Sequence, residues 1–254
     1  MTRTSTVKIK DHFSGHAALY ADTRPDYPDE LFRTLAAMAS GTNRAWDCAT
    51  GNGQAALSLA RYFDTVFATD ASEQQIRQAR KSERVHYHVA SAESAAIAAG
   101  TIDLIVVAQA LHWFDTALFV EEARRVLKSE GLLAAWCYTG VRISPDVDAL
   151  VSSYYRDTVG PYWPPERRHV DSGYRTLHLP LIEEQVAPFS IEKEWDFARF
   201  VQYLRSWSAT QRYMRARGQD PLEASIGALS RAWGPLTKMR RMQWPLVVRV
   251  GRLA

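Results

Sequence analysis

Short apolar runs recur along the first half of the chain. They are rich in Val, Ile, Ala and Trp, and each is short enough to be a strand. The run at 102–108 is almost fully apolar, as expected for a strand that is covered on both faces. We predict strands at 44–49, 65–70, 85–90, 102–108 and 132–138.

The segments between these runs have helical patterns. Residues 54–62 and 117–127 are amphipathic, and residues 72–82 are polar with Ser72 as the expected N-cap. Gly131 follows the second amphipathic segment and is the expected stop signal of that helix. Strands that alternate with helices predict βαβ units, and right-handed crossovers then give a doubly wound α/β fold with a parallel sheet.

The pattern changes near residue 141. Aromatic residues become frequent and three prolines interrupt the stretch around 161–165, so residues 142–182 are expected to form a mainly helical cap inserted over the sheet. Further along, strands are predicted at 189–195 and 243–250, with Pro245 placing the second near a sheet edge. Helices are predicted between them at 196–217 and 221–233.

We therefore divide the chain into three parts. Residues 1–141 hold an N-terminal cover segment and a ligand-binding core, residues 142–182 hold the cap, and residues 183–254 complete the core and add cap-side helices. The last two parts together carry 17 basic and 12 acidic residues, an excess too small to identify a nucleic-acid binder.

Composition excludes several classes of protein. The 254 residues are 46% hydrophobic and 23% charged, which is typical of a globular domain. Two cysteines are too few for a secreted disulfide scaffold, and no apolar run approaches the ~20 residues that span a bilayer. The first residues lack the apolar core of a signal peptide. We expect a cytoplasmic protein without a membrane partner, either a monomer or a homodimer.

The strongest chemical signal is a glycine-containing turn after the first predicted strand. Gly51 and Gly53 allow a sharp turn that lies against a ligand, and Asp70 ends the next strand where a carboxylate can accept both ribose hydroxyls. An ordinary strand–helix turn is the simpler alternative. Residues 51–56 also fit a dinucleotide pattern, but Asp47 beside the loop would repel a pyrophosphate and would favour a cationic ligand.

The next strand ends extend this pattern. Ala92 and Glu93 follow the third predicted strand, and the segment QALHWFD at 109–115 follows the fourth. Ligands of open α/β sheets bind outside the carboxyl ends of the strands, so these segments are expected to converge on one crevice.

Together these segments resemble the class I S-adenosylmethionine-dependent methyltransferases. The closer resemblance is to the methyltransferase type 11 group, and within it to trans-aconitate-type small-molecule enzymes. It rests on WDCATGNGQAALSLA (46–60), ATDAS (68–72), SAES (91–94), QALHWFD (109–115), and on 11–28 and 194–213. The resemblance implies a Rossmann-like sheet of seven strands, of which the last is antiparallel.

The resemblance also implies a cofactor site for S-adenosyl-L-methionine. Asp47 would lie near the amino group of the cofactor, the glycines against its methionine part, and Asp70 at its ribose. Tyr27 belongs to the N-terminal segment that would cover the pocket. The full expected set is Tyr20, Arg24, Asp47, Cys48, Ala49, Gly51, Gly53, Asp70, Ala71, Ile76, Ala92, Glu93, Gln109 and Ala110. The family usually has a glycine where Ala49 or Thr50 stands.

The acceptor side is less specific. His112 and Trp113 are the expected catalytic residues, with His112 as general base if the acceptor is a hydroxyl, and Trp113, Tyr155 and Trp207 are expected to bind substrate. Structural hydrogen bonding and core packing are the simpler roles for these residues.

Arg212, Arg215 and Arg217 form a basic helix face that is either solvated or attracts a carboxylate. Cys137 fits a small buried hydrophobe, and no metal-binding motif is present, so no metal is expected.

We therefore predict an enzyme that methylates a small molecule, with a carboxylate as one acceptor class. An NAD(P)-dependent oxidoreductase and an RNA methyltransferase remain as alternatives. A module that binds the cofactor without catalysis is a third.

Overall fold

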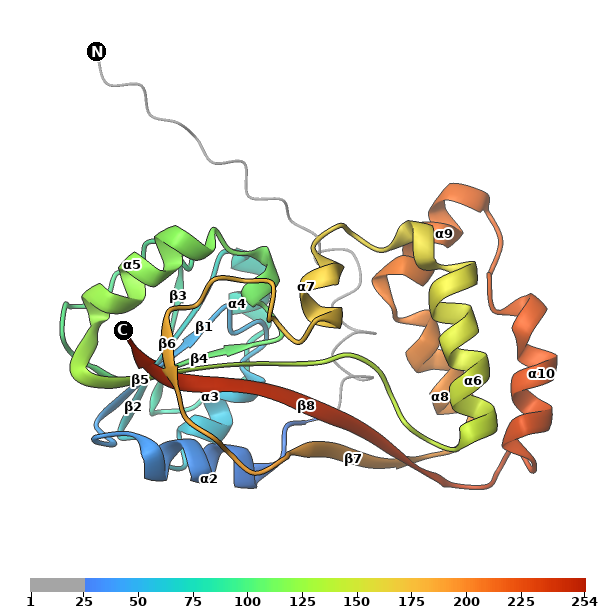
Figure 1. Cartoon of the computed structure of the whole chain (residues 1–254), viewed down its shortest axis with the longest axis horizontal. Coiled ribbons are helices and arrows are strands. Elements are labelled where there is room, and N and C mark those ends of the chain that lie inside the picture. Colours follow the sequence, from blue (N-terminus) through green and yellow to red (C-terminus); the bar gives the residue numbers. More distant parts are fainter. Residues whose placement is uncertain (1–25) are drawn as a thin grey trace, which may run out of the picture.

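Eight strands form one sheet in the computed structural model, which describes residues 26–254 (Figure 1). The strands follow the order β3-β2-β1-β4-β5-β8-β6, and β7 pairs with the first half of β8. Their bounds are β1 Arg44–Cys48, β2 Thr65–Asp70, β3 Val85–Val89, β4 Ile102–Ala108, β5 Leu127–Tyr138, β6 Leu181–Glu183, β7 Ser190–Trp195 and β8 Arg240–Leu253.

The direction of the strands agrees with the expected fold. Strands β1 to β5 pair in parallel, and β8 lies antiparallel between β5 and β6. The predicted Rossmann-like sheet with an antiparallel last strand is therefore confirmed, and β7 adds an eighth strand to the expected seven.

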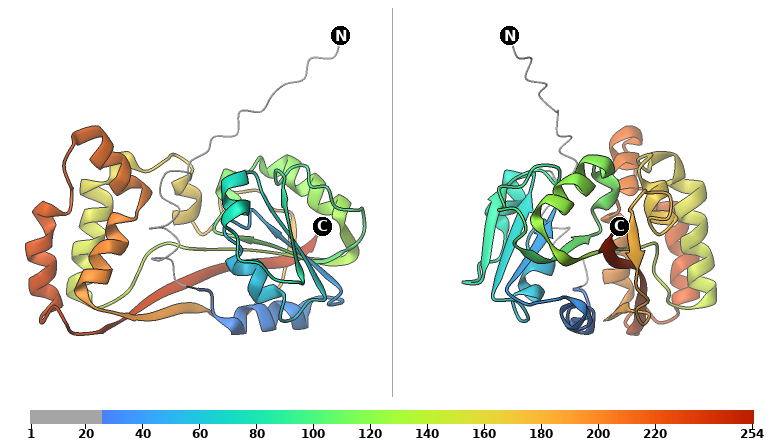
Figure 2. Two further views of the ribbon diagram at one scale, coloured as in Figure 1. Left: turned by 180° about the vertical axis from the view of Figure 1, so that it is seen from behind. Right: turned by 60° about the vertical axis from the view of Figure 1, so that its left-hand side comes forward.

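The helices form two groups. Helices α2 to α5 flank the parallel strands, whereas α6, α8, α9 and α10 make a separate layer beside the sheet, and α7 lies between the two groups (Figures 1 and 2). The bounds are α2 Asp29–Met38, α3 Gln54–Leu59, α4 Glu73–Gln78, α5 Thr116–Val126, α6 Pro145–Ser153, α7 Arg167–Asp171, α8 Phe197–Arg205, α9 Ser208–Arg217 and α10 Glu223–Trp233. Short 3-10 turns lie at η1 Leu111–Trp113 and η3 Gly160–Tyr162, and a π-helical turn lies at η2 Tyr154–Thr158.

Side chains of the central strands alternate between two apolar layers. Ala134 and Trp136 of β5 pack with α2, α3 and the aromatic residues of the helical layer. Leu133, Ala135 and Cys137 pack on the opposite face with α5 and α7. This period of two, with helices on both faces, is what a doubly wound sheet requires.

Gly131 and Pro245 were expected to end a helix and to mark a sheet edge, and the structure gives them other roles. Helix α5 ends at Val126 and the chain enters β5 directly, so Gly131 is not a helix stop. Gly131 lies where the β4–β5 register shifts, and a Cβ there would lie 2.7 Å from the Leu127 side chain. Strand β8 as a whole is not an edge strand, because it lies between β5 and both β6 and β7. Pro245 itself is paired with Ser190 of β7, and the pairing with β5 begins one residue later, at Leu246.

The predicted helix at 196–217 is two helices. Helix α8 ends at Arg205, and Trp207 has an extended backbone before α9 begins. The Ser206 hydroxyl donates to the Tyr203 carbonyl, and the Trp207 ring is buried among aromatic residues. The chain therefore interrupts the helix and buries the Trp207 ring. This break places the α8–α9 junction at the cavity described below.

Within residues 26–254, no helix has the length and apolar character needed to cross a bilayer.

Candidate active site

Asp47 lies at the end of β1 and is fully buried. One carboxylate oxygen accepts a hydrogen bond from the Thr50 hydroxyl, and the other has no hydrogen-bond partner among the described residues. Burial raises the pKa of this carboxyl from 3.8 to about 7. Because a buried oxygen without a partner costs free energy, the position favours a ligand that brings a donor or a cation.

Asp70 joins the glycine loop to the end of β2. Its two carboxylate oxygens accept hydrogen bonds from the backbone N–H groups of Gly51, at 2.9 Å, and Ser72, at 2.8 Å. The carboxylate that the sequence assigns to a ribose is therefore held beside the loop by two backbone donors.

The two loop glycines have different surroundings. Both have positive φ, +57° at Gly51 and +88° at Gly53. A Cβ on Gly51 would meet nothing nearer than the Gln75 amide oxygen at 4.0 Å, so the space above it is open. A Cβ on Gly53 would lie 2.2 Å from the Tyr87 hydroxyl. Gly51 thus leaves room for a ligand, whereas the Tyr87 side chain itself explains why position 53 needs glycine.

Two predicted cofactor residues, Cys48 and Glu93, make contacts within the protein itself. The Cys48 side chain is fully buried in the apolar layer shared with α5. Glu93 accepts a hydrogen bond from the Asp115 backbone N–H at 3.0 Å, which ties the segment after β3 to the start of α5. Ala92 and Ala110 are nearly buried, and Ala71 and Ile76 are half-buried.

Ala49 and Gln109 follow the adjacent strands β1 and β4, and both have φ of +58° although neither is glycine. Such backbone conformations cost free energy outside glycine and often occur at functional sites. The Gln109 backbone N–H donates to the Trp136 carbonyl at 2.9 Å. Its side chain lines a cavity beside the glycine loop, together with Gln75.

This cavity lies between the sheet and the helical layer. It brings together four predicted acceptor-side residues, His112, Trp113, Tyr155 and Trp207. The wall is completed by Trp163, from the aromatic stretch at 154–163, and by Tyr203 and Arg167, which we did not predict. The predicted cofactor residue Gln109 thus shares one cavity with the predicted acceptor residues.

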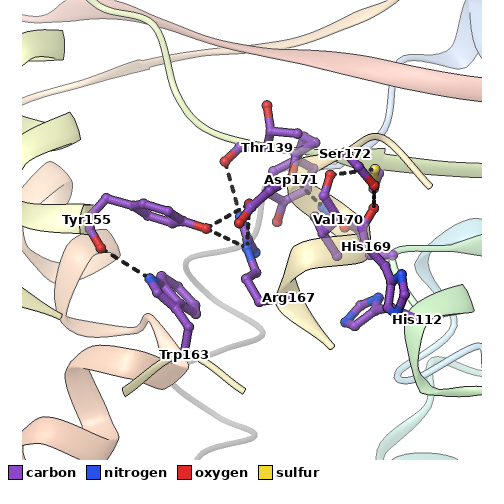
Figure 3. A network of polar contacts seen from close by, with 12 residues as sticks. His112, Thr139, Tyr155, Trp163, Arg167, His169, Val170, Asp171 and Ser172 are labelled. Atoms are coloured by element: carbon purple, nitrogen blue, oxygen red, sulfur yellow. Dashed lines mark hydrogen bonds and ion pairs between the residues drawn. The ribbon is translucent and has the colours of Figure 1, made fainter. Parts of the chain in front are cut away.

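Arg167 places a half-buried positive charge in the cavity wall (Figure 3). Its Nε donates to the Tyr155 hydroxyl at 2.9 Å and to Asp171 at 3.1 Å, and its Nη2 donates to the Thr139 carbonyl at 3.1 Å. The guanidinium carbon lies 4.8 Å from the centre of the Trp163 ring, within cation–π range. The arginine therefore orders three parts of the wall at once.

Arg215 is the second cation that lines the cavity. It lies in the last turn of α9, and no carboxylate among the described residues forms an ion pair with it. No Asp or Glu belongs to the described part of the cavity lining. With Arg167 balanced by Asp171, the wall retains a net positive charge.

His112 is a neutral group in this cavity. Its burial, with Arg167 and His169 nearby, lowers its pKa from 6.5 to about 3. Nδ1 of the ring lies 3.4 Å from the Tyr174 hydroxyl. A general base works best when its pKa lies near the working pH, so this environment disfavours proton abstraction by His112.

Some predicted features lie elsewhere. Tyr20 and Arg24 fall outside the described residues, while the Tyr27 ring packs edge-on against Trp136 with centroids 5.4 Å apart. Arg217 bonds to the Tyr162 hydroxyl, away from the cavity lining. No group of His, Cys, Asp or Glu within residues 26–254 could hold a metal ion.

Arg167 had no signal in the sequence that could have identified it. It lies in a proline-rich stretch without periodicity. Its place in the wall depends on the hydrogen bond to the Thr139 carbonyl, which lies 28 positions earlier in the sequence. The aromatic residues of the wall are partly visible as the cluster at 154–163.

Comparisons with known proteins agree with this geometry. Residues 46–135 match the family described as a methyltransferase domain. A methyltransferase of Dictyostelium discoideum is 33% identical over 230 residues, which cover 89% of this chain and 88% of that protein. A Saccharomyces cerevisiae protein described as an S-adenosylmethionine-dependent methyltransferase is 26% identical over 188 residues, covering 68% of this chain and 63% of its own length.

A solved structure from Anaeromyxobacter dehalogenans, described as a type II methyltransferase, is 44% identical to this chain. The two superpose with a TM-score of 0.86 over 90% of this chain and 97% of the other.

Proposed function

Because the chain belongs to the class I S-adenosylmethionine-dependent methyltransferases, we propose that it methylates the carboxylate of a small organic acid. The cofactor is S-adenosyl-L-methionine, and the oxidoreductase alternative is set aside. The small-molecule acceptor and the ester product are the parts of this proposal that go beyond the family.

The residues around the glycine loop fit this cofactor. The open oxygen of Asp47 suits an ammonium group, and the space above Gly51 admits a chain of atoms that a Cβ would displace. The two backbone hydrogen bonds of Asp70 fix its carboxylate beside Gly51, where the resemblance expects the ribose. When bound, the cofactor supplies an electrophilic methyl group on a positively charged sulfur.

One observation carries the choice of acceptor: the described wall of the cavity contains two arginines and no carboxylate. A positive wall favours an anionic acceptor, and Arg is well suited to a carboxylate because its planar fork can donate two hydrogen bonds. The aromatic rings of Tyr155, Trp163 and Trp207 would pack on the carbon skeleton of the acid.

The state of His112 supports the same acceptor. A carboxylate is ionised at neutral pH and needs no base, whereas a hydroxyl would need one, and the pKa of His112 is about 3. The chain then accelerates the reaction mainly by holding the reactants in position, an effect worth roughly 7–11 kcal/mol in well-oriented systems. The resemblance to trans-aconitate-type enzymes stays a prediction and suggests which acids to test first.

The test is a panel of small carboxylic acids with matched alcohols and primary amides, incubated with the cofactor and analysed by mass spectrometry. We expect a methyl ester, released again by mild alkali, from at least one acid and none from its alcohol. Methylation of alcohols, amines or RNA with no ester formed would overturn the proposal. Asp47→Asn serves as the variant that removes the expected ammonium partner.

A further inference from the structure

Tyr174 has a backbone conformation that its residue type disfavours. Its φ is +63°, and it follows Gly173, whose φ is +62°, just after the end of α7. A bulky aromatic residue in this region is a true outlier, and such residues persist only where the surrounding structure fixes them. The Tyr174 side chain is also fully buried. The strain therefore calls for an explanation in terms of what the conformation achieves.

Two backbone contacts hold Tyr174 in this conformation. Its N–H donates to the His169 carbonyl at 2.7 Å, across the end of α7. Its carbonyl accepts a hydrogen bond from Arg249 of β8 at 3.0 Å, and the same Arg249 nitrogen bonds to the Leu177 carbonyl at 3.2 Å. The position of the Tyr174 side chain is thus set by β8 as well as by α7.

The conformation directs the Tyr174 ring at His112. The two rings lie nearly parallel, 27° apart, with centroids separated by 6.1 Å, and the hydroxyl lies 3.4 Å from Nδ1. Among the described residues, Nδ1 of His112 is a hydrogen-bond partner of this hydroxyl, which carries a proton that it can donate. A neutral imidazole accepts at the nitrogen that lacks hydrogen, so donation by Tyr174 places the ring hydrogen on Nε2.

We propose that Tyr174 is a positioning residue that keeps His112 in the tautomer with hydrogen on Nε2, and that His112 uses this N–H to donate a hydrogen bond to an oxygen of the acceptor. The inference rests on the proposed function, and it assigns the His112 ring an orienting role in place of proton abstraction.

The surroundings of His112 agree with a neutral donor. Arg167 and His169 lie near the ring and oppose its protonation. His112 lines the cavity, and its Nε2 makes no hydrogen bond to another described residue. A neutral N–H can hold one carboxylate oxygen without adding a further charge that would hold the acid too strongly before reaction. The other oxygen is then left to attack the methyl group.

The tautomer is measurable without any acceptor. We would label histidine with 15N, assign the His112 signals by their loss in His112→Gln, and determine which ring nitrogen carries hydrogen. Hydrogen on Nε2 in the wild-type protein supports the inference, and hydrogen on Nδ1 overturns it. This result is independent of which acid is methylated, so an acid panel that fails would count against the proposed function alone.

Activity of matched variants gives the second test. Tyr174→Phe keeps the ring and removes the hydroxyl, and we expect kcat to fall about tenfold with the cofactor affinity unchanged, as for the loss of one hydrogen bond. Tyr154→Phe is the control, since Tyr154 is also buried and its hydroxyl bonds to Thr210 outside the cavity lining. We expect that control to keep wild-type kcat.

A conservative replacement of His112 shows whether the ring acts as a hydrogen-bond donor or only fills space. His112→Gln retains an N–H near the position of Nε2, so it should keep several-fold more kcat than His112→Ala. Equal activity of these two variants, or unchanged kcat in Tyr174→Phe with a normal unfolding temperature, would overturn the inference.

Discussion

The proposed active site has a cofactor side and an acceptor side, which are built in different ways. The cofactor side consists of the loop at 47–53 and of Asp70, and it relies on backbone N–H groups and positive φ angles. The acceptor side consists of side chains from η1, the π-helical turn η2, α7 and the α8–α9 junction, which are far apart in the sequence. A local motif therefore specifies the first side, and only the folded chain assembles the second.

The two sides also differ in charge. Buried Asp47 and half-buried Asp70 make the cofactor side negative, whereas the acceptor side is positive because Arg215 lines it and Asp171 balances only Arg167. This polarity matches a cationic cofactor facing an anionic acceptor. Each prediction below changes one side and asks whether the other side is affected.

The largest effect is expected for Asp47→Asn. The change removes the carboxylate that would pair with the cofactor's ammonium group, so affinity for S-adenosylmethionine should fall by about 100-fold or more. Calorimetric titration measures it, with the exposed Asp64→Asn as the matched control. Unchanged affinity would show that Asp47 is not part of the cofactor site.

The same substitution should stabilise the protein without ligand. Burial raises the pKa of the Asp47 carboxyl from 3.8 to about 7 in the folded protein, so the unfolded chain ionises at lower pH than the folded one. The free energy of unfolding therefore falls as pH rises from about 4 to 7, by roughly 4 kcal/mol in total. Asp47→Asn should therefore gain stability over the wild type at pH 8 but little at pH 4. Denaturant unfolding at both pH values is the measurement, and an equal difference at the two pH values would contradict it.

On the acceptor side, Arg167→Gln should reduce kcat/KM for the acid by roughly 10- to 100-fold, since a hydrogen bond to a charged group is worth ~1.5–3 kcal/mol. The cofactor affinity should stay within twofold, because the affected contacts with Tyr155, Asp171 and Thr139 are on the acceptor side. Steady-state kinetics with each substrate varied checks this. A matching loss of cofactor affinity would remove the distinction between the two sides.

The pH dependence of cofactor binding gives a smaller, graded effect. Below pH 7 Asp47 takes up a proton, so cofactor affinity should fall by up to about tenfold for each pH unit between 7 and 5. Calorimetry over this range measures the slope, and Asp47→Asn should show none. A flat wild-type profile would mean that another group binds the ammonium.

Two glycine substitutions distinguish backbone strain from steric conflict. Gly51→Ala and Gly53→Ala both place a Cβ at positive φ, and this backbone strain should lower the free energy of unfolding by about 1–2 kcal/mol in each variant. Only Gly53→Ala also collides with the Tyr87 hydroxyl, so it should lower the free energy of unfolding further. Gly51→Ala should instead weaken cofactor binding more than stability. Chemical denaturation and calorimetry on both variants test this, and the reverse order would refute our account of the loop.

The smallest effect concerns Ala49. Its φ of +58° costs free energy that glycine would not incur, although glycine loses more entropy on folding. Ala49→Gly should therefore raise the free energy of unfolding by at most about 1 kcal/mol, with cofactor affinity unchanged. A destabilised variant would show that the alanine methyl makes a packing contribution.

The sequence predicted the parallel strands, the glycine loop and the position of Asp70, because each depends on residues close together in the chain. It did not predict Arg167 or the strain at Tyr174. The contact of Tyr174 with Arg249 joins residues 75 positions apart, and no local pattern at 167–177 encodes it. Gly131 and Pro245 were misinterpreted for the same reason: their roles depend on strand pairing that local rules do not include.

Strand β8 has a consequence for how the protein is made on the ribosome. It lies between β5 and both β6 and β7, so the sheet stays open until residues 246–251 have been synthesised. Until then the edge of β5 at 133–138, whose residues are later buried, has no partner strand. Open apolar edges recruit other chains. The nascent protein should therefore depend on chaperones until β8 is complete, and early termination before residue 246 should yield aggregates instead of a functional cofactor-binding half.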